Sequence, residues 1–479
     1  KKFNSYLFKL LKFSMKYDFG LVGLGVMGRN FILNVAENGF SAIGLSSRKE
    51  SIEKLENDGK DFVVKGTSDS KVFIESLTVP RKIMLLVPAG NPVDSVIDSF
   101  LPHLSPGDII IDGGNSHYDD TERRFEKLDK LNIHFLGTGV SGGSKGARLG
   151  PSIMPGGKID AYDIVRPIFE KASAKVDDIP CVSYLGNTSA GHYVKMIHNG
   201  IEYAMMQIIS EAYHIMKLGM KMSNQEIHQT FTQWNKGKLN SYLIEITADI
   251  FKAKEVETGE YLVDLILDKA KQKGTGKWTS QSAMDFGVAV PTIDSSVSMR
   301  IISSFKETRR SGEKIFSKPK SIIGDIEVND IENALIYGFT MCYAQGLSQL
   351  KITSEEKKYD LNYEEICKIW RGGCIIRAKL LEEFMFAFNK NPDLVNLIFD
   401  SEISEMIKES DSYARKVSVY SINNKIPSLA LNSSISYFDA LTTEKLPMNL
   451  IQAQRDCFGE HTFERVDMNG TFHNENWQS

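Results

Sequence analysis

One face of a predicted helix between residues 191 and 209 carries an unbroken row of polar side chains. The rest of the segment is largely apolar, which predicts a buried helix. The polar residues recur at positions i, i+3, i+4, i+7 and i+8, so they share one face. They are Lys195, His198, Asn199, Glu202 and Tyr203. Because lysine and glutamate are rarely buried alone, the row indicates a functional cavity; the alternative is a structural Lys195–Glu202 pair on a solvent face.

The two ionisable ends of this row suit acid–base chemistry. Lys195 and Glu202 are two helical turns apart, about 10 Å along the axis, so they can flank one small substrate. Lysine has an ordinary pKa of about 10.4, and burial together with nearby cations would lower it towards neutrality. Burial would also raise the pKa of the Glu202 carboxyl, which would make it the acid that complements a lysine base.

A glycine-rich turn predicts a dinucleotide site. Gly23, Leu24, Gly25, Val26, Met27 and Gly28 match G-x-G-x-x-G. A predicted strand at 19–22 precedes the motif, and a predicted helix at 29–38 and a second strand at 41–45 follow it. The glycines permit a tight turn and let the backbone approach a pyrophosphate at the helix N-terminus.

The turn after the second strand bears on the choice of coenzyme. NAD-binding domains usually place an Asp or Glu there, to bind the ribose hydroxyls. This chain has Ser46, Ser47 and Arg48, whose hydroxyls and cation suit a 2'-phosphate. We therefore expect NADP, and the alternative is a solvated turn that happens to be basic.

Two further turns follow predicted strands of the same sheet. Asn115 comes after the strand at 108–112, and Ser141, Gly142 and Gly143 follow a strand predicted to end at Leu136. Ligands of open α/β sheets bind beyond the carboxyl ends of the strands, and consecutive glycine amides can bind anions. These residues are therefore candidate ligand contacts.

The elements that must position these residues form two domains and two terminal segments. Alternating strands and helices over residues 18–189 predict a Rossmann-type, doubly wound α/β domain. Residues 190–445 read as a large all-α domain, and residues 446–479 as a polar tail. Residues 1–17 form an N-terminal extension, of which residues 1–14 either lie upstream of a start at Met15 or form a short amphipathic surface helix.

Composition excludes several function classes. The net charge of -4 gives no basic surplus for nucleic acid, and no apolar run approaches the roughly 20 residues of a membrane span. The five cysteines are scattered without a Cys-x-x-Cys pair. We expect a cytoplasmic protein that uses no metal and binds neither nucleic acid nor membrane.

The ordered motifs resemble those of the 6-phosphogluconate dehydrogenases, the decarboxylating enzymes of the pentose phosphate pathway and gluconate utilization. The resemblance extends from Tyr17 to the C-terminus. It rests on the glycine-rich turn, the polar row and the segments 111–115, 139–143, 154–157, 273–279, 370–377 and 452–456. It implies oxidative decarboxylation of 6-phosphogluconate to ribulose 5-phosphate and CO2, with reduction of NADP to NADPH.

The resemblance also implies residue roles. Lys195 takes the proton from the hydroxyl at carbon 3 while hydride passes to the nicotinamide, and Glu202 protonates carbon 1 of the product. Asn115 and His198 complete the catalytic set. The implied substrate contacts are Asn115, Ser141, Gly142, Gly143, His198, Asn199, Tyr203, Lys273, Thr275, Arg300, Arg455 and His461. The implied coenzyme contacts are Gly23, Leu24, Gly25, Val26, Met27, Gly28, Ser46, Ser47, Arg48, Val87, Pro88, Ala89 and Asn115.

Arg455 and His461 lie in the tail. In the family that this chain resembles, the tail threads into the neighbouring subunit. The resemblance therefore implies a homodimer with tail exchange, in which these two residues complete the site of the partner.

Three positions depart from the family pattern. Gly25 stands where Ala is usual, Arg48 is displaced by one position in the second-strand turn, and Pro88 replaces a lysine. The last change removes a cation and a backbone donor, which predicts weaker coenzyme binding. The preference between NADP and NAD therefore stays open at this stage.

Two other functions remain as alternatives. One is a β-hydroxyacid dehydrogenase or reductase that does not decarboxylate, and the other is a catalytically silent coenzyme-binding regulator. Glu202, Lys273 and Arg455 favour the decarboxylating enzyme over the first, and the set of Lys195, Asn115 and Glu202 disfavours the second.

Overall fold

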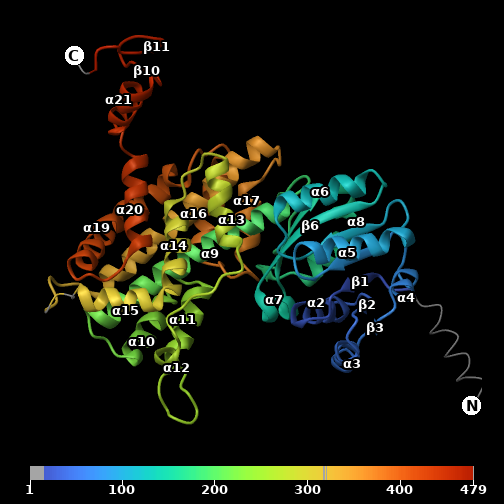
Figure 1. Ribbon diagram of the computed structural model, residues 1–479. Coiled ribbons are helices and arrows are strands. Elements are labelled where there is room, and N and C mark those ends of the chain that lie inside the picture. Colours follow the sequence, from blue (N-terminus) through green and yellow to red (C-terminus); the bar gives the residue numbers. More distant parts are fainter. Residues whose placement is uncertain (1–15, 317–318, 320, 478–479) are drawn as a thin grey trace, which may run out of the picture.

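The structure is a computed structural model that describes residues 16–316, 319 and 321–477. The expectation for residues 1–14 therefore lies outside the described residues. Tyr17 already belongs to the first folded unit, because it pairs with Leu77 in a parallel bridge beside the sheet. Figure 1 shows an α/β lobe built from the first part of the chain, a larger helical lobe and a projecting C-terminal segment.

The α/β lobe contains a seven-stranded sheet in the order β3-β2-β1-β4-β5-β6-β7. All neighbouring strands are parallel except β6 and β7, which are antiparallel. The strands are β1 (Phe19–Val22), β2 (Ala42–Leu45), β3 (Val64–Thr67), β4 (Lys82–Leu85), β5 (Ile109–Asp112), β6 (His134–Ser141) and β7 (Ser152–Gly157).

Helices cover both faces of this sheet, which confirms the doubly wound prediction. Alternate residues of one strand enter different cores: Ile109 and Ile111 join one apolar cluster, and Ile110 joins the other. The helices of this lobe are α2 (Val26–Glu37), α3 (Lys49–Asp58), α4 (Ser70–Glu75), α5 (Asn91–Phe100), η1 (Leu101–His103), α6 (Tyr118–Asp129), α7 (Gly143–Leu149) and α8 (Ile159–Ala172). A small hairpin, β8 (Lys175–Val176) and β9 (Ile179–Pro180), leads out of the lobe.

Two predicted boundaries were wrong. Helix α2 begins at Val26, inside the glycine motif, rather than after Gly28. Strand β6 does not end at Leu136 but continues to Ser141, because β7 pairs with it through Ser152. Residues 139–141 therefore belong to a strand and not to a turn.

The second lobe is helical, as predicted. Its helices are α9 (Ala190–His214), η2 (Ile215–Gly219), α10 (Asn224–Trp234), α11 (Tyr242–Lys252), α12 (Leu262–Leu265), α13 (Thr275–Asp285), α14 (Pro291–Ser304), α15 (Lys306–Ile315), α16 (Val328–Lys357), α17 (Tyr363–Trp370), α18 (Leu380–Lys390), η3 (Leu397–Phe399), α19 (Ser401–Asn423) and α20 (Leu429–Leu441). Helices α9 and α16 pack together at the centre of this lobe.

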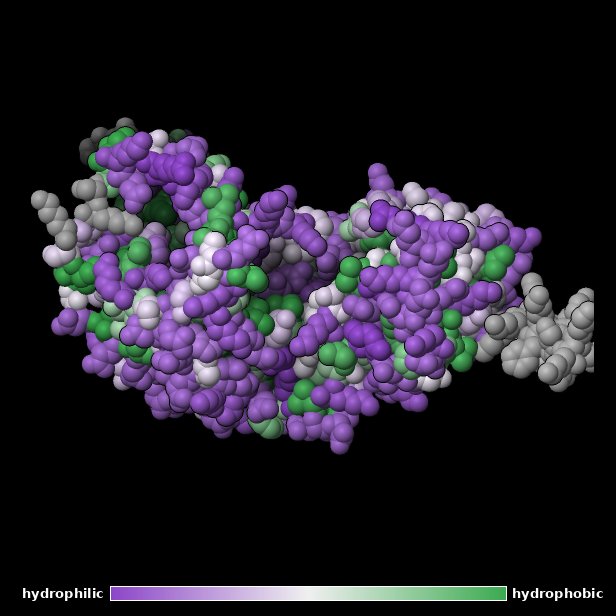
Figure 2. All heavy atoms as spheres, turned by 90° about the horizontal axis from the view of Figure 1, so that it is seen from below, coloured by the Kyte–Doolittle hydropathy of each residue, from purple (hydrophilic) through white to green (hydrophobic). Residues whose placement is uncertain are grey.

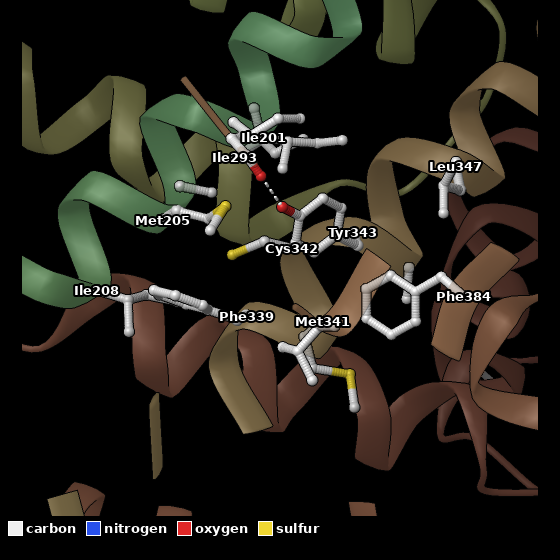
Figure 3. Close-up of a cluster of buried hydrophobic side chains, with 14 of the residues drawn as sticks. Ile201, Met205, Ile208, Ile293, Phe339, Met341, Cys342, Tyr343, Leu347 and Phe384 are labelled. Carbon is white, nitrogen blue, oxygen red and sulfur yellow. Dashed lines mark hydrogen bonds between the residues drawn. The ribbon is translucent and has the colours of Figure 1, made fainter. Parts of the chain in front are cut away.

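Figure 3 shows part of the core between these two helices, where Ile201 and Met205 of α9 lie near Cys342 and Tyr343 of α16. The Tyr343 hydroxyl donates a hydrogen bond to the carbonyl of Ile376. The middle of α9 is therefore enclosed by the helical lobe.

The tail consists of α21 (Met448–Gly459) and a hairpin of β10 (Phe463–Glu464) and β11 (Thr471–Phe472). Figure 1 shows that it projects beyond the helical lobe. The face seen in Figure 2 is largely hydrophilic, with hydrophobic residues in small separate patches. Within the described residues, none of the helices combines the length and the apolar character that a membrane span needs.

Candidate active site

Helix α9 lies unusually close to the last two strands of the sheet, because glycines face each other where they meet. A Cβ at Gly139 of β6 would lie 2.9 Å from Lys195 Cγ, and a Cβ at Gly191 of α9 would lie 2.6 Å from the backbone nitrogen of Gly156 in β7. Any larger side chain at these points would push the helix away from the sheet. The glycines therefore bring Lys195 next to the carboxyl end of β6.

Four of the predicted site residues meet there. Lys195 Nζ donates a hydrogen bond of 2.8 Å to Asn199 Oδ1 and lies 3.2 Å from His198 Nδ1. On the other side of the ring, His198 Nε2 lies 3.2 Å from the hydroxyl oxygen of Ser141, the last residue of β6. Lys195 is only 6% exposed, so the alternative of a lysine on a solvent face is wrong.

Burial shifts the pKa values of Lys195 and His198. It lowers the pKa of Lys195 to about 8, although the charge of Glu202 opposes the change. Burial, and then the charge of Lys195, hold the pKa of His198 well below its usual range, so the imidazole is neutral. A neutral imidazole carries one N–H, and it can direct this donor either to Asn199 or to Ser141.

Glu202 and Tyr203 continue the row towards the helical lobe. Glu202 is half-buried, and burial raises the pKa of its carboxyl against the opposing charges of Lys195 and Arg300. The Arg300 guanidinium of α14 stacks on the Tyr203 ring at 3.4 Å from its centroid. Burial lowers the pKa of Arg300, but an arginine stays charged at neutral pH.

The N-terminal end of α13 closes this part of the site. A Cβ at Gly276 would lie 2.5 Å from the Tyr203 ring, so the helix can pack on that ring only through a glycine. Thr275 is buried as the first residue of α13, whereas Lys273 is exposed just before it. The structure therefore brings Arg300 and the first turn of α13, which contains Thr275, against the Tyr203 ring, and Lys273 is exposed just before that turn.

Sequence reasoning assigned no role to two buried residues around the polar group. The Trp370 ring packs edge-on against His198, with centroids 5.7 Å apart. Cys374 is buried near enough to Lys195 for the lysine charge to affect its pKa, which burial raises to about 12. The Gly373 carbonyl would lie 2.5 Å from a Cβ at Gly142. In the sequence these residues appeared only as part of the segment 370–377 that carries the resemblance, because their contacts join distant parts of the chain.

The predicted coenzyme residues lie beyond neighbouring parallel strands. Gly23 follows β1 with φ +98°, and a Cβ there would lie 2.5 Å from the Leu86 carbonyl, so only glycine fits. Ser46, Ser47 and Arg48 follow β2. The other predicted contacts follow the next two strands: Val87, Pro88 and Ala89 after β4 and Asn115 after β5. Since these strands are adjacent, the turns share one edge of the sheet.

Two predicted substrate residues lie away from the group around Lys195 and His198 in their own subunit. Arg455 and His461 are exposed in the tail, and Figure 1 shows α21 projecting away from the lobe that contains α9.

Comparison with known proteins decides the family. Residues 18–186 match the model for the NAD binding domain of 6-phosphogluconate dehydrogenase. Residues 191–477 match the model described as 6-phosphogluconate dehydrogenase, C-terminal domain.

The chain belongs to the 6-phosphogluconate dehydrogenase family.

Relatives in this family match nearly the whole chain. The NADP(+)-dependent, decarboxylating 6-phosphogluconate dehydrogenase of Bacillus subtilis (strain 168) is 49% identical over 464 residues, which is 96% of this chain and 99% of the relative. The decarboxylating 6-phosphogluconate dehydrogenase of Escherichia coli (strain K12) is 48% identical over 466 residues, with the same shares covered.

A solved structure agrees. It is that of Plasmodium falciparum 6-phosphogluconate dehydrogenase, described in its apo form, with its cofactor NADP+ and with its substrate 6-phosphogluconate. It superimposes with a TM-score of 0.93 at 46% identity and covers 96% of this chain and 100% of that chain.

The structure places two of the departures from the 6-phosphogluconate dehydrogenase pattern, and the predicted effect of Pro88 on coenzyme binding stays a prediction. Gly25 has φ -66°, and a Cβ there would meet no atom within 4 Å of the described structure, so the usual Ala would fit equally well. Pro88 is exposed in the turn after β4 and has no N–H to offer a phosphate or an amide.

Proposed function

We propose that this protein catalyses the oxidative decarboxylation of 6-phosphogluconate to ribulose 5-phosphate and CO2, with reduction of NADP to NADPH. The observation that carries the proposal is the buried group of Ser141, Lys195, His198 and Asn199. It places a lysine with a pKa of about 8 beside a neutral imidazole, at the carboxyl end of a strand in a dinucleotide-binding sheet.

The edge of the sheet that carries the predicted coenzyme contacts fits NADP in three respects. The backbone is uncovered at Gly25, the N-terminus of α2 faces the same turn, and no carboxylate stands among Ser46, Ser47 and Arg48. Gly23 to Gly28 would hold the pyrophosphate, and Ser46 to Arg48 would hold the 2'-phosphate. When bound, NADP supplies the hydride acceptor.

Lys195 acts as the base of the oxidation step. With a pKa of about 8, about one tenth of the amine is neutral at pH 7. The neutral Nζ takes the proton of the carbon 3 hydroxyl as the hydride leaves the same carbon, and a 3-keto acid results. Asn199 accepts a hydrogen bond from Nζ and so fixes its position for this transfer.

Decarboxylation uses the proton that Lys195 has gained. The bond between the carboxylate and carbon 2 breaks, CO2 leaves, and the electron pair flows towards the new carbonyl. Lys195 returns its proton to that oxygen, which gives an enediol. Glu202 is the acid that then protonates the carbon that lost the carboxylate, since burial favours its protonated form. As it does so, the neutral Lys195 takes back the hydroxyl proton from the carbon 3 oxygen, so that the ketone of ribulose 5-phosphate forms.

The remaining residues hold the two anionic ends of the substrate. Ser141, Gly142, Gly143 and His198 bind the sugar acid beside Asn115. The positively charged Arg300, stacked on Tyr203, binds the phosphate together with Lys273 and Thr275.

We further propose that the active form is a homodimer with tail exchange, in which Arg455 and His461 complete the partner's site. The projecting tail exposes apolar side chains, among them Leu450 and Phe458, that a second subunit would cover. The helical lobe has a cavity of about 1010 Å³ whose wall includes Arg300, one of the proposed phosphate ligands. Such a cavity offers room for an incoming tail.

The test is stoichiometry combined with truncation. One CO2 should be released for each NADPH formed from 6-phosphogluconate, and near-zero release would indicate an enzyme that does not decarboxylate. Removal of residues 455–479 should abolish turnover, whereas full activity of the shortened chain would refute tail exchange.

A further inference from the structure

The tail is organised around one buried carboxylate. Asp456, in the last turns of α21, is fully buried although most of its neighbours are exposed. Its Oδ1 accepts hydrogen bonds from the Thr462 backbone N–H and from His473 Nδ1, each 2.9 Å long. Its Oδ2 accepts from the Asn474 backbone N–H at 3.0 Å and from Trp477 Nε1 at 2.7 Å.

These four donors flank the hairpin on both sides. Thr462 precedes β10, His473 and Asn474 follow β11, and Trp477 lies near the end of the described chain. One carboxylate therefore ties both ends of the hairpin to α21. Although its burial would raise the pKa of Asp456, the four hydrogen bonds lower it below its usual range, so the group stays ionised.

The backbone around His461 needs such a tie. Glu460 and Thr462, on either side of His461, adopt φ values of +51° and +62°. Left-handed conformations are costly for residues other than glycine, and they persist only when surrounding contacts enforce them. The hydrogen bond from the Thr462 N–H to Asp456 is one such contact, and Gln452 Nε2 donates another to the Thr462 carbonyl at 2.6 Å.

We infer that Asp456 is a positioning residue for catalysis: with His473 and Trp477 it forms a clamp that fixes Arg455 and His461 in the geometry that the partner's site requires. The inference rests on the tail exchange proposed above. Asp456 itself does not touch the substrate. Arg455 is its chain neighbour, and His461 lies inside the loop that the clamp closes.

The sharpest variant is Asp456→Asn. An asparagine keeps the size of the side chain but has only one oxygen, so its NH2 group faces two of the four donors and repels them. We therefore expect the clamp to open although the volume of the side chain at position 456 stays the same. Trp477→Phe is a milder second variant, because it removes one donor and keeps an aromatic ring beside Phe463. Asp467→Asn is the matched control, since Asp467 pairs with Arg465 at the exposed end of the same hairpin.

Steady-state kinetics give the first readout. For Asp456→Asn we expect kcat/KM for 6-phosphogluconate to fall at least about tenfold, while KM for NADP and the melting temperature of the main body stay near wild type. Trp477→Phe should show a smaller loss in the same parameter, and Asp467→Asn should show none. Wild-type kinetics in Asp456→Asn would overturn the inference.

Mixed dimers separate this inference from the tail exchange on which it rests. A purified heterodimer of one Lys195→Ala subunit and one Asp456→Asn subunit has one site with an intact lysine and an intact incoming tail. It should recover about half of the wild-type rate, although both parent homodimers are nearly inactive or impaired. The parallel heterodimer of Lys195→Ala and Arg455→Ala should recover in the same way.

The outcomes are distinct. If neither heterodimer recovers, tail exchange is wrong. If the Arg455→Ala heterodimer recovers and the Asp456→Asn heterodimer does not, tail exchange stands and the clamp is refuted, because Asp456 then supports only its own subunit.

Discussion

Helix α9 depends on a close approach at Gly139, so Gly139→Ala tests whether that approach positions the base. The added Cβ would lie 2.9 Å from Lys195 Cγ and 3.2 Å from the Gly191 carbonyl oxygen. Carbon atoms normally rest about 3.5–4.0 Å apart, so α9 must retreat from β6 by about 1 Å. Lys195 would move with it, away from Ser141.

The expected size of the effect follows from this displacement. A misplacement of about 1 Å can lower a rate about 100-fold, which corresponds to about 2.7 kcal/mol in the activation free energy. Overpacking a buried contact lowers the free energy of unfolding by about 1–3 kcal/mol. We therefore expect a folded enzyme with kcat reduced about 100-fold.

The assay measures NADPH formation together with NADP binding by titration. Binding should be unchanged, because the glycine-rich turn follows β1 and is separated from β6 by β4 and β5. Gly312→Ala in α15 is the control, since a Cβ there meets no atom of the described structure within 4 Å and should leave kcat unchanged. A Gly139→Ala enzyme with kcat within about twofold of wild type would refute the reasoning. Equal losses of turnover and of NADP binding would instead indicate a general folding defect.

Three further predictions follow from the site. First, kcat/KM should rise with pH and level off above about 8, because burial lowers the pKa of Lys195 to about 8 and only the neutral amine accepts the proton; a flat profile from about pH 6 to about 9 would contradict a lysine base. Second, Arg48→Ala should lower kcat/KM for NADP by about tenfold or more and leave that for NAD nearly unchanged, so equal losses with both coenzymes would exclude a 2'-phosphate contact. Third, Arg300→Met should raise KM for 6-phosphogluconate by about 10- to 100-fold without changing KM for NADP, and an unchanged substrate KM would remove Arg300 from the phosphate site.

Local patterns predicted the positions of the site residues well. The polar row of α9 was visible because helical spacing and side-chain type are both properties of the sequence. The glycine-rich turn was visible because its strand and helix are its immediate neighbours. Ser141, Lys195, His198 and Asn199 do meet, which agrees with the common site that the family resemblance implied for them.

Contacts between distant segments were not predictable in the same way. The strand was predicted to end at Leu136 with a turn after it, but it continues to Ser141, and glycine is needed at positions 137 and 139 because α9 packs on β6 there. Trp370 contacts His198 from about 170 residues further along the chain, and no pattern among its sequence neighbours predicts that contact. The same holds for Asp456, whose partners lie up to 21 residues away.

Helix α9 belongs to both lobes, because its first turns rest on β6 and β7 and its middle is enclosed by α16. During synthesis, β6 and β7 therefore stay uncovered until the ribosome has released α9, which lies well beyond the last strand of the sheet. A gene fragment that stops before α9 would leave the glycine-lined faces of β6 and β7 bare. The two family models meet between residues 186 and 191, but this point does not separate two units that fold independently. It is therefore a poor place to cut the protein for recombinant expression.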